Sequence, residues 1–234
     1  MRDQHVNRSR RYLLGAIPAL ALTAAACGSN QTVEEVKQGA GPAPKPTTPD
    51  EAIRVLADGN TRFAAGTPKI RDTADIEVLW SDITTSQNPF ATVLGCADSR
   101  LAPELIFDQF VGDIFVVREA GNIAESPTNL GSLEFGQAVL KSKALVVLGH
   151  SDCGAVKAAF TNATPGGNIQ AIVDVIKSGI TGAASLDDAI ERNVRAVIDR
   201  VRKNSTLLRD AEQTGAVKIV GAVYDIKTAT VRFL

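Results

Sequence analysis

The chain has 234 residues, enough for one folded domain and a short additional segment. Hydrophobic residues make up 44% and charged residues 22%, a composition typical of a globular protein with a buried core. A formal charge of −1 without a long basic run argues against nucleic-acid binding, and the odd number of cysteines, three, argues against a disulfide framework.

Residues 1–26 are predicted to be a signal peptide. Four arginines precede an apolar run over residues 13–26, and that run is too short and interrupted to span a membrane. Arg10 and Arg11 resemble a twin-arginine export motif. Three alanines followed by Cys27 resemble a lipoprotein cleavage site, so Cys27 is the predicted lipidation site; cleavage nearby without a lipid is the alternative.

Residues 27–47 are predicted to be a flexible linker, because residues 39–46 are rich in proline and glycine. Such a linker would hold a folded domain away from a membrane; a functionless N-terminus is the alternative. We therefore expect an exported bacterial protein, either lipid-anchored on the outer face of the cell membrane or free in the periplasm or medium. The predicted anchor would be its one contact with a membrane.

Residues 48–234 are predicted to form one domain in which helices and strands alternate. Thr48 to Glu51 has the pattern of a capping box, and the helix that it begins is expected to end at Gly66. Further helices are expected at residues 129–141, from about residue 153, at 168–177 and at 185–204; strands are expected at 92–96, 113–117, 144–150, 217–224 and 230–234. The alternation predicts an α/β fold: a mostly parallel central β-sheet with flanking helices and a C-terminal antiparallel edge strand.

Three metal-type ligands follow two of these strands. Cys96 ends the first strand, His150 ends another, and Cys153 lies three residues beyond it. Because sites in open α/β sheets lie beyond the carboxyl ends of the strands, the three side chains are expected to meet. Two thiolates and one imidazole would hold Zn²⁺ with a fourth position open, as in catalytic zinc sites. Alone, either cysteine would be interpreted as a small buried apolar residue.

The surroundings of these ligands favour catalysis. Ser151 is the expected cap of a helix that begins near Cys153, and a helix N-terminus favours the thiolate. Two thiolate ligands reduce the ability of zinc to lower the pKa of a bound water molecule. Another group must therefore help to form hydroxide. Asp98 is that candidate, because it can accept a hydrogen bond from zinc-bound hydroxide, and Arg100 can hold it bidentately and keep it ionised. The alternative is that Asp98 and Arg100 form a structural loop pair.

The stretches 96–100 (Cys-Ala-Asp-Ser-Arg) and 150–154 (His-Ser-Asp-Cys-Gly) resemble those of the β-class carbonic anhydrases. Further similar stretches are Gly59-Asn60, Arg62-Phe63, residues 114–118, Gly121-Asn122, residues 132–135 and residues 223–225. The resemblance covers about residues 48–234. It implies reversible hydration of CO₂ to bicarbonate and a proton by zinc-bound hydroxide, one Zn²⁺ per chain, and a homodimer or larger homo-oligomer.

The resemblance also implies roles for individual residues. Asp98 can swing onto the zinc as an alternative fourth ligand in a closed, inactive state. Substrate-binding residues are implied at Gln87, Gly154, Phe115, Ala120 and Phe135, the last three lining a CO₂ pocket from a partner subunit. Phe135 stands where plant-type members have tyrosine. Val93 replaces the tryptophan of an inhibitory bicarbonate pocket found in some bacterial members.

Other functions compete with this interpretation. A zinc hydrolase of the same fold could act on a CO₂ analogue such as carbon disulfide, and access to the pocket would separate the two. A non-catalytic exported zinc-binding protein is disfavoured by the Asp98–Arg100 pair, which storage does not need. A thiol redox protein is disfavoured because Cys96 and Cys153 do not form a Cys-x-x-Cys pair.

Overall fold

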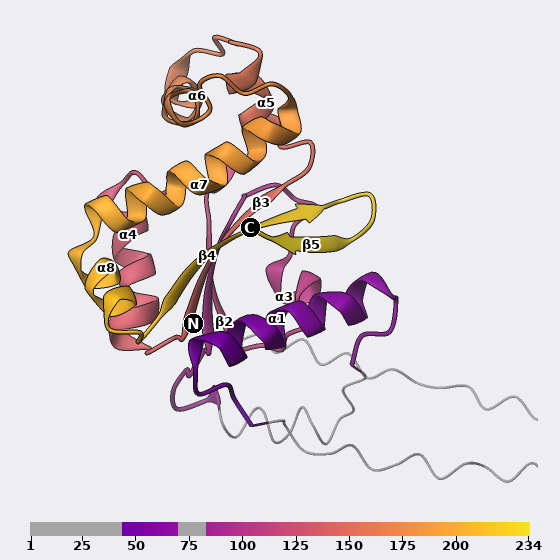
Figure 1. Ribbon diagram of the computed structural model, residues 1–234, viewed down its shortest axis with the longest axis vertical. Helices are drawn as coiled ribbons and strands as arrows, with labels where there is room; N and C mark the ends of the chain where they lie inside the picture. Colours follow the sequence, from indigo (N-terminus) through magenta and orange to yellow (C-terminus); the bar gives the residue numbers. More distant parts are fainter. Residues whose placement is uncertain (1–43, 70–82) are drawn as a thin grey trace, which may run out of the picture. The chain divides into compact units, whose positions relative to one another are not determined.

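A computed structural model describes residues 44–69 and 83–234, and Figure 1 shows how their helices and strands are arranged. The predictions for the signal peptide, most of the linker and Cys27 lie outside the described residues. At the centre is a five-stranded sheet in the order β2-β1-β3-β4-β5. The first four strands run parallel and β5 pairs antiparallel with β4, which confirms the predicted α/β fold.

Each strand begins and ends within one residue of its predicted bounds, and β5 ends one residue earlier than predicted. Their bounds are Ala91–Gly95 (β1), Ile114–Arg118 (β2), Ala144–His150 (β3), Lys218–Asp225 (β4) and Thr230–Phe233 (β5). Every residue of β1 and β3 is buried, as expected for central parallel strands covered on both faces. Because β1 pairs with β3 in register, with Gly95 opposite Leu148, their carboxyl ends lie side by side.

The helices follow the prediction less closely. Their bounds are Pro49–Ala64 (α1), Pro103–Ile106 (α3), Pro127–Glu134 (α4), Gly154–Phe160 (α5), Gly167–Gly179 (α6), Leu186–Asn204 (α7) and Thr206–Gln213 (α8), with short helices at Ala120–Asn122 (η1) and Phe135–Val139 (η2). The single helix expected over residues 129–141 is instead α4 followed by a π-helical turn, η2. Neither α3 nor α8 was expected from the sequence.

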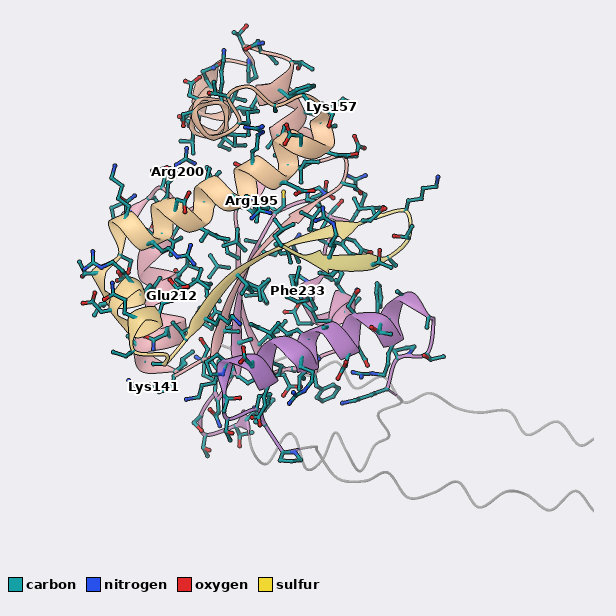
Figure 2. The ribbon with its side chains drawn as sticks, in the orientation of Figure 1. Lys141, Lys157, Arg195, Arg200, Glu212 and Phe233 are labelled. Atoms are coloured by element: carbon teal, nitrogen blue, oxygen red, sulfur yellow. The ribbon has the colours of Figure 1, made fainter. Side chains whose placement is uncertain are left out.

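The two faces of the sheet are covered by different helices. α1 and α3 lie on one side, and α4, α7 and α8 lie on the other (Figure 1). On the α1 side, Phe233 packs against Phe107 with ring centroids 6.5 Å apart (Figure 2). The predicted capping box of α1 is present, with Thr48 accepting from the Glu51 N–H and Glu51 accepting from the Thr48 N–H.

On the other face, α7 packs closely over β3 and β4 because two glycines leave room for it. A Cβ on Gly149 would lie 2.6 Å from Val194, and one on Gly221 would lie 2.8 Å from the same side chain. Ser185 caps this helix, accepting from the Asp188 N–H. Among the described residues, no helix is both long and apolar enough to cross a membrane.

Candidate metal centre

The structure brings Cys96, His150 and Cys153 together at one end of the sheet. Cys96 follows β1 directly, His150 is the last residue of β3, and Cys153 lies just before α5. All three are buried, with 5% or less of each residue exposed. Their ligand atoms all lie within 4.8 Å of one another, a spacing that suits one metal ion. We refer to these three residues as the Cys–His–Cys cluster.

His150 is oriented so that one ring nitrogen faces this cluster. Its Nδ1 lies 3.0 Å from the carbonyl oxygen of Ser151, and because a carbonyl can only accept, Nδ1 carries the proton. Nε2 therefore holds a lone pair, and within the described residues it is buried without a hydrogen-bond partner. An unpaired lone pair beside two sulfur atoms is the arrangement expected of a metal ligand whose other nitrogen is held by the backbone.

The two thiols depend on each other. A hydrogen bond from Cys153 is the main cause that lowers the pKa of Cys96, and the Gly121 N–H adds to it. The same contact with Cys96, together with burial, raises the pKa of Cys153, and the N–H groups at the start of α5 oppose this only weakly. Without a cation the pair therefore holds one thiolate readily and resists a second. A divalent cation such as Zn²⁺ would stabilise both, so this donor set fits zinc.

Ser151 does not cap α5, contrary to the sequence prediction. Cys153 occupies the N-cap position, and its side chain makes no capping hydrogen bond. The Ser151 hydroxyl instead accepts from the N–H of Ile226, 3.0 Å away, and its own N–H donates to the carbonyl of Tyr224. Ser151 thus ties the loop after His150 to the end of β4, which fixes the carbonyl that holds the His150 ring.

Asp98 and Arg100 form the predicted pair beside the cluster. Arg100 Nε lies 2.9 Å from Oδ1 and Nη2 lies 2.7 Å from Oδ2 of Asp98, a bidentate contact. These hydrogen bonds hold the pKa of Asp98 well below its usual range, although partial burial opposes them. Asp98 Oδ2 is 4.0 Å from His150 Nε2, so an ionised carboxylate lies at the edge of the cluster.

Two arginines hold the loops that carry the cluster. Arg118, at the end of β2, donates from Nε to the Cys96 carbonyl at 3.0 Å and from Nη2 to the Asp98 carbonyl at 2.6 Å. Arg100 also donates to the carbonyl of Asp152, 3.3 Å away, in the loop between His150 and Cys153. Hydrogen bonds from the two guanidinium groups therefore connect the loops at the carboxyl ends of β1, β2 and β3.

Sequence reasoning assigned no role to three residues at this centre. Arg118 and Gly121 fell in stretches that carried the family resemblance, and nothing in their spacing indicated that they contact the loop of Cys96. The Gly121 N–H lies 3.2 Å from Cys96 Sγ. Asn193, which donates to the Gly121 carbonyl at 2.9 Å, had one sequence signal: it is a polar residue on the apolar stripe of the helix expected at 185–204.

The implied substrate-binding residues lie at different places in the chain. Gln87 is exposed in the loop before β1, and Gly154 is exposed as the first residue of α5, next to Cys153. Ala120 precedes Gly121 in η1. Phe115 pairs with Thr92, four residues before Cys96, and its ring lies 6.1 Å from that of the half-exposed Phe135.

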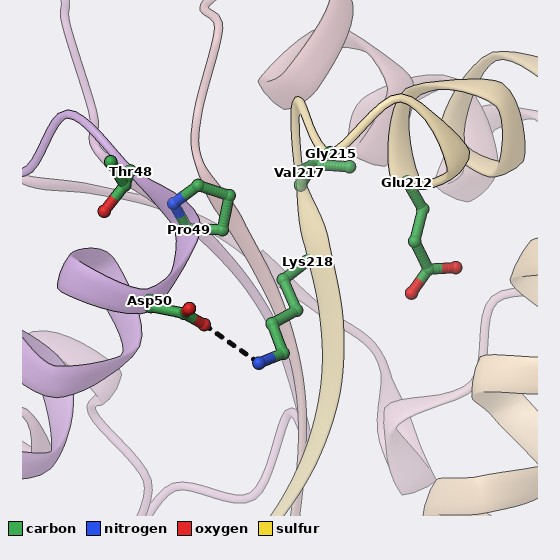
Figure 3. A pocket seen from close by; sticks show the side chains of 7 residues that line it. All are labelled: Thr48, Pro49, Asp50, Glu212, Gly215, Val217 and Lys218. Carbon is green, nitrogen blue, oxygen red and sulfur yellow. Dashed lines mark hydrogen bonds and ion pairs between the residues drawn. The ribbon is translucent and has the colours of Figure 1, made fainter.

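A separate hollow of about 370 Å³ lies at the opposite end of the sheet (Figure 3). It is lined by Thr48, Pro49, Asp50, Glu212, Gly215, Val217 and Lys218. Lys218 begins β4, opposite the first residue of β3, and its ammonium lies 2.9 Å from Asp50. This hollow is therefore distinct from the Cys–His–Cys cluster. Substitutions in it should not affect the cluster directly.

Comparisons with known proteins agree with this geometry. The family described as carbonic anhydrase matches residues 91–231. A carbonic anhydrase of Mycolicibacterium smegmatis is 37% identical over 189 residues, which cover 77% of this chain and 90% of that protein. Carbonic anhydrase 2 of Mycobacterium tuberculosis is 35% identical with the same coverage.

Solved structures show the same fold. The Coccomyxa β-carbonic anhydrase, solved with acetazolamide, is 27% identical with a TM-score of 0.61, over 76% of this chain and 84% of that one. A structure from a study of two tetrameric β-carbonic anhydrases of Sordaria macrospora gives a TM-score of 0.63 at 23% identity, over 79% of this chain and 97% of that one.

Proposed function

The chain belongs to the β class of the carbonic anhydrase family, and from this membership and its site geometry we propose that it hydrates CO₂ reversibly to bicarbonate and a proton. The observation that carries the proposal is the meeting of Cys96, His150 and Cys153 beside an ionised Asp98. The cofactor is Zn²⁺. When bound, zinc acts as a Lewis acid and lowers the pKa of a water molecule to about 7.

We propose that Cys96, His150 and Cys153 hold one zinc ion per chain. His150 would bind through Nε2, because Nδ1–H is held by the Ser151 carbonyl. The N–H groups of Gly121 and of the first turn of α5 face the two sulfur atoms and offset part of their negative charge. Arg118 fixes the backbone on either side of Ala97, so the direction of the Cys96 side chain is set by the sheet.

Asp98 is the proposed orienting base. Its Oδ2, 4.0 Å from His150 Nε2, would accept a hydrogen bond from the attacking water and turn an oxygen lone pair toward CO₂. Arg100 keeps the carboxylate ionised and occupies both of its oxygens, which favours the open state over the closed one in which Asp98 becomes a fourth ligand. This use of the pair also argues against a non-catalytic zinc-binding protein.

Substrate would be held by groups around this centre. The exposed N–H of Gly154 and the side chain of Gln87 are the proposed polar contacts. Phe115, Ala120 and Phe135 are the proposed apolar lining. Because the register of β2 sets Phe115 well back from the Cys–His–Cys cluster of its own chain, we propose that Phe115 and Phe135 act on the cluster of a second copy, in a homodimer or larger homo-oligomer.

We further propose that the domain of residues 48–234 is exported. The support is in the sequence: Arg10 and Arg11 before an apolar run, and Cys27 after three alanines. The mature protein would be lipid-anchored outside the cell membrane through the linker of residues 27–47, or would lie free in the periplasm or medium. Export of a folded protein suits a site whose thiolates should meet zinc before they meet an oxidising compartment.

Stopped-flow measurement of CO₂ hydration by the purified protein tests the proposed activity. We expect hydration that is lost on chelation and restored by Zn²⁺. Lys218→Met, in the hollow at the far end of the sheet, should keep wild-type activity. Protein that contains zinc, is folded and does not hydrate CO₂ would contradict the proposal.

A further inference from the structure

Helix α7 contacts the end of β3, which carries His150, and the η1 turn, which lies beside Cys96. It runs across the sheet over β3 and β4 (Figure 1). Its Val194 fits against Gly149, the residue before His150, where a Cβ would lie 2.6 Å from the valine methyl. The preceding residue, Asn193, donates from its side-chain nitrogen to the Gly121 carbonyl at 2.9 Å.

Gly121 is the residue through which Asn193 reaches the cluster. Its N–H lies 3.2 Å from Cys96 Sγ, and it adopts a left-handed conformation with φ of +72°. There is no space for a side chain there, because a Cβ would lie 2.5 Å from Ile176 and 3.3 Å from Ala155. The backbone at Gly121 is therefore confined by α5 and α6, and its carbonyl is held from α7.

Asn193 is an unusual residue for its position. It is fully buried on a helix face that is otherwise apolar, between Ile190 and Val197. Its side-chain oxygen has no hydrogen-bond partner among the described residues. A buried amide with an unpaired oxygen stabilises a core less than an apolar side chain of the same size would. Stability of the helix alone therefore does not explain an asparagine here.

We propose that Asn193 is a positioning residue for the metal centre, holding Gly121 so that the Gly121 N–H donates to Cys96 Sγ. A hydrogen bond to a metal-bound thiolate withdraws charge from the sulfur and fixes its direction, and such outer contacts typically change metal affinity or activity by about 10–100-fold. The inference rests on the proposed zinc site of this chain and assigns Asn193 a role in it.

Zinc affinity and the spectrum of the cobalt-substituted protein test this role. Asn193→Leu and Asn193→Ala remove the donor, whereas Val201→Ala removes buried apolar volume two helical turns away, about 12 Å along α7. Competition with a chromophoric chelator gives the zinc dissociation constant. The thiolate-to-cobalt charge-transfer band of Co²⁺-loaded protein reports charge on the sulfur, which a purely structural role would not change.

We expect both Asn193 variants to bind zinc about 10–100-fold more weakly and to move the charge-transfer band to longer wavelength, because the sulfur keeps more charge. Val201→Ala should lower the unfolding temperature and change neither readout. Wild-type zinc affinity and an unshifted band in both Asn193 variants would overturn the inference, as would failure of both to fold while Val201→Ala folds. A wild-type protein that binds no zinc would contradict the proposed function itself.

Discussion

Arg100 donates hydrogen bonds to both carboxylate oxygens of Asp98, two residues before it in the chain, and Asp98 Oδ2 lies 4.0 Å from Nε2 of His150. The contact is only part of what Arg100 does, because the same guanidinium donates to the backbone of Asp152 in the other ligand loop. One side chain therefore sets both the ionisation of the proposed base and the distance between the two loops.

Removing the bidentate contact between Arg100 and Asp98 should reduce the rate of catalysis more than it reduces the stability of the fold. We expect Arg100→Leu to lower kcat/KM for CO₂ hydration by about 10–100-fold with zinc still bound. Arg100→Lys should recover only part, since an ammonium cannot make the bidentate contact. Arg209→Leu, which breaks an exposed pair with Asp210, is the control and should keep wild-type activity. Equal activity in Arg100→Leu and wild type would show that the pair is structural.

Proton release should depend on external buffer. His150 is the one histidine among residues 44–69 and 83–234, and an imidazole that binds the proposed zinc cannot carry protons away. Burial and the Asp225 charge raise the pKa of Tyr224, which makes that phenol poorly matched to neutral pH. At saturating CO₂ and about pH 7.5, kcat should rise with an imidazole-type buffer and then plateau, while kcat/KM stays flat. A kcat already maximal at the lowest buffer concentration would indicate an internal proton carrier.

The capping box of α1 predicts a loss of stability in acid. N–H and hydroxyl groups of Thr47 and the Thr48 N–H donate to Glu51 and lower its pKa in the folded state. Glu51 therefore stabilises the fold above its unfolded pKa of about 4.3, and this contribution is lost as the pH falls through the lower folded pKa. In urea unfolding, the stability difference between wild type and Glu51→Gln should shrink across this window. A difference that stays constant with pH would contradict the assignment.

Export and anchoring have their own test. Replacing Arg10 and Arg11 together by lysine should leave the uncleaved precursor in the cell, because the twin-arginine pair is the proposed export signal. Cys27→Ser should give a protein without lipid. Detergent phase partitioning and mass spectrometry of the mature N-terminus provide the measurements. Wild-type protein that stays wholly in the aqueous phase would remove the lipid anchor from the account.

The sequence predicted the sheet and the meeting of the three ligands because both follow from local patterns. Continuous apolar runs mark β1 and β3, and their ends carry Cys96 and His150, so the parallel topology alone brings these residues together. Strand β3 spans the predicted residues, and β1 is displaced by one, which moves Cys96 just beyond it.

What the sequence could not predict depends on contacts between distant segments. The helix expected at 129–141 turns π-helical where Gly136 lies against Thr92 of β1; a Cβ there would come within 2.3 Å of the threonine hydroxyl. The hydrogen bonds of Arg118 and Asn193 likewise link residues 20 to 72 positions apart. No local sequence pattern predicts hydrogen bonds between such distant residues. A polar residue on an apolar helix face, such as Asn193, only indicates that its side chain takes part in one.

The most direct test is the rate of CO₂ hydration measured while Zn²⁺ is added to the metal-free protein. The account predicts a rate that rises linearly to one zinc per chain and then stays constant. Cys96→Ser and Cys153→Ser should bind less zinc, unfold at lower temperature and show little activity, because ligand binding contributes to folding stability. Activity that does not follow zinc, or stoichiometric tight zinc in either cysteine variant, would contradict the proposed site.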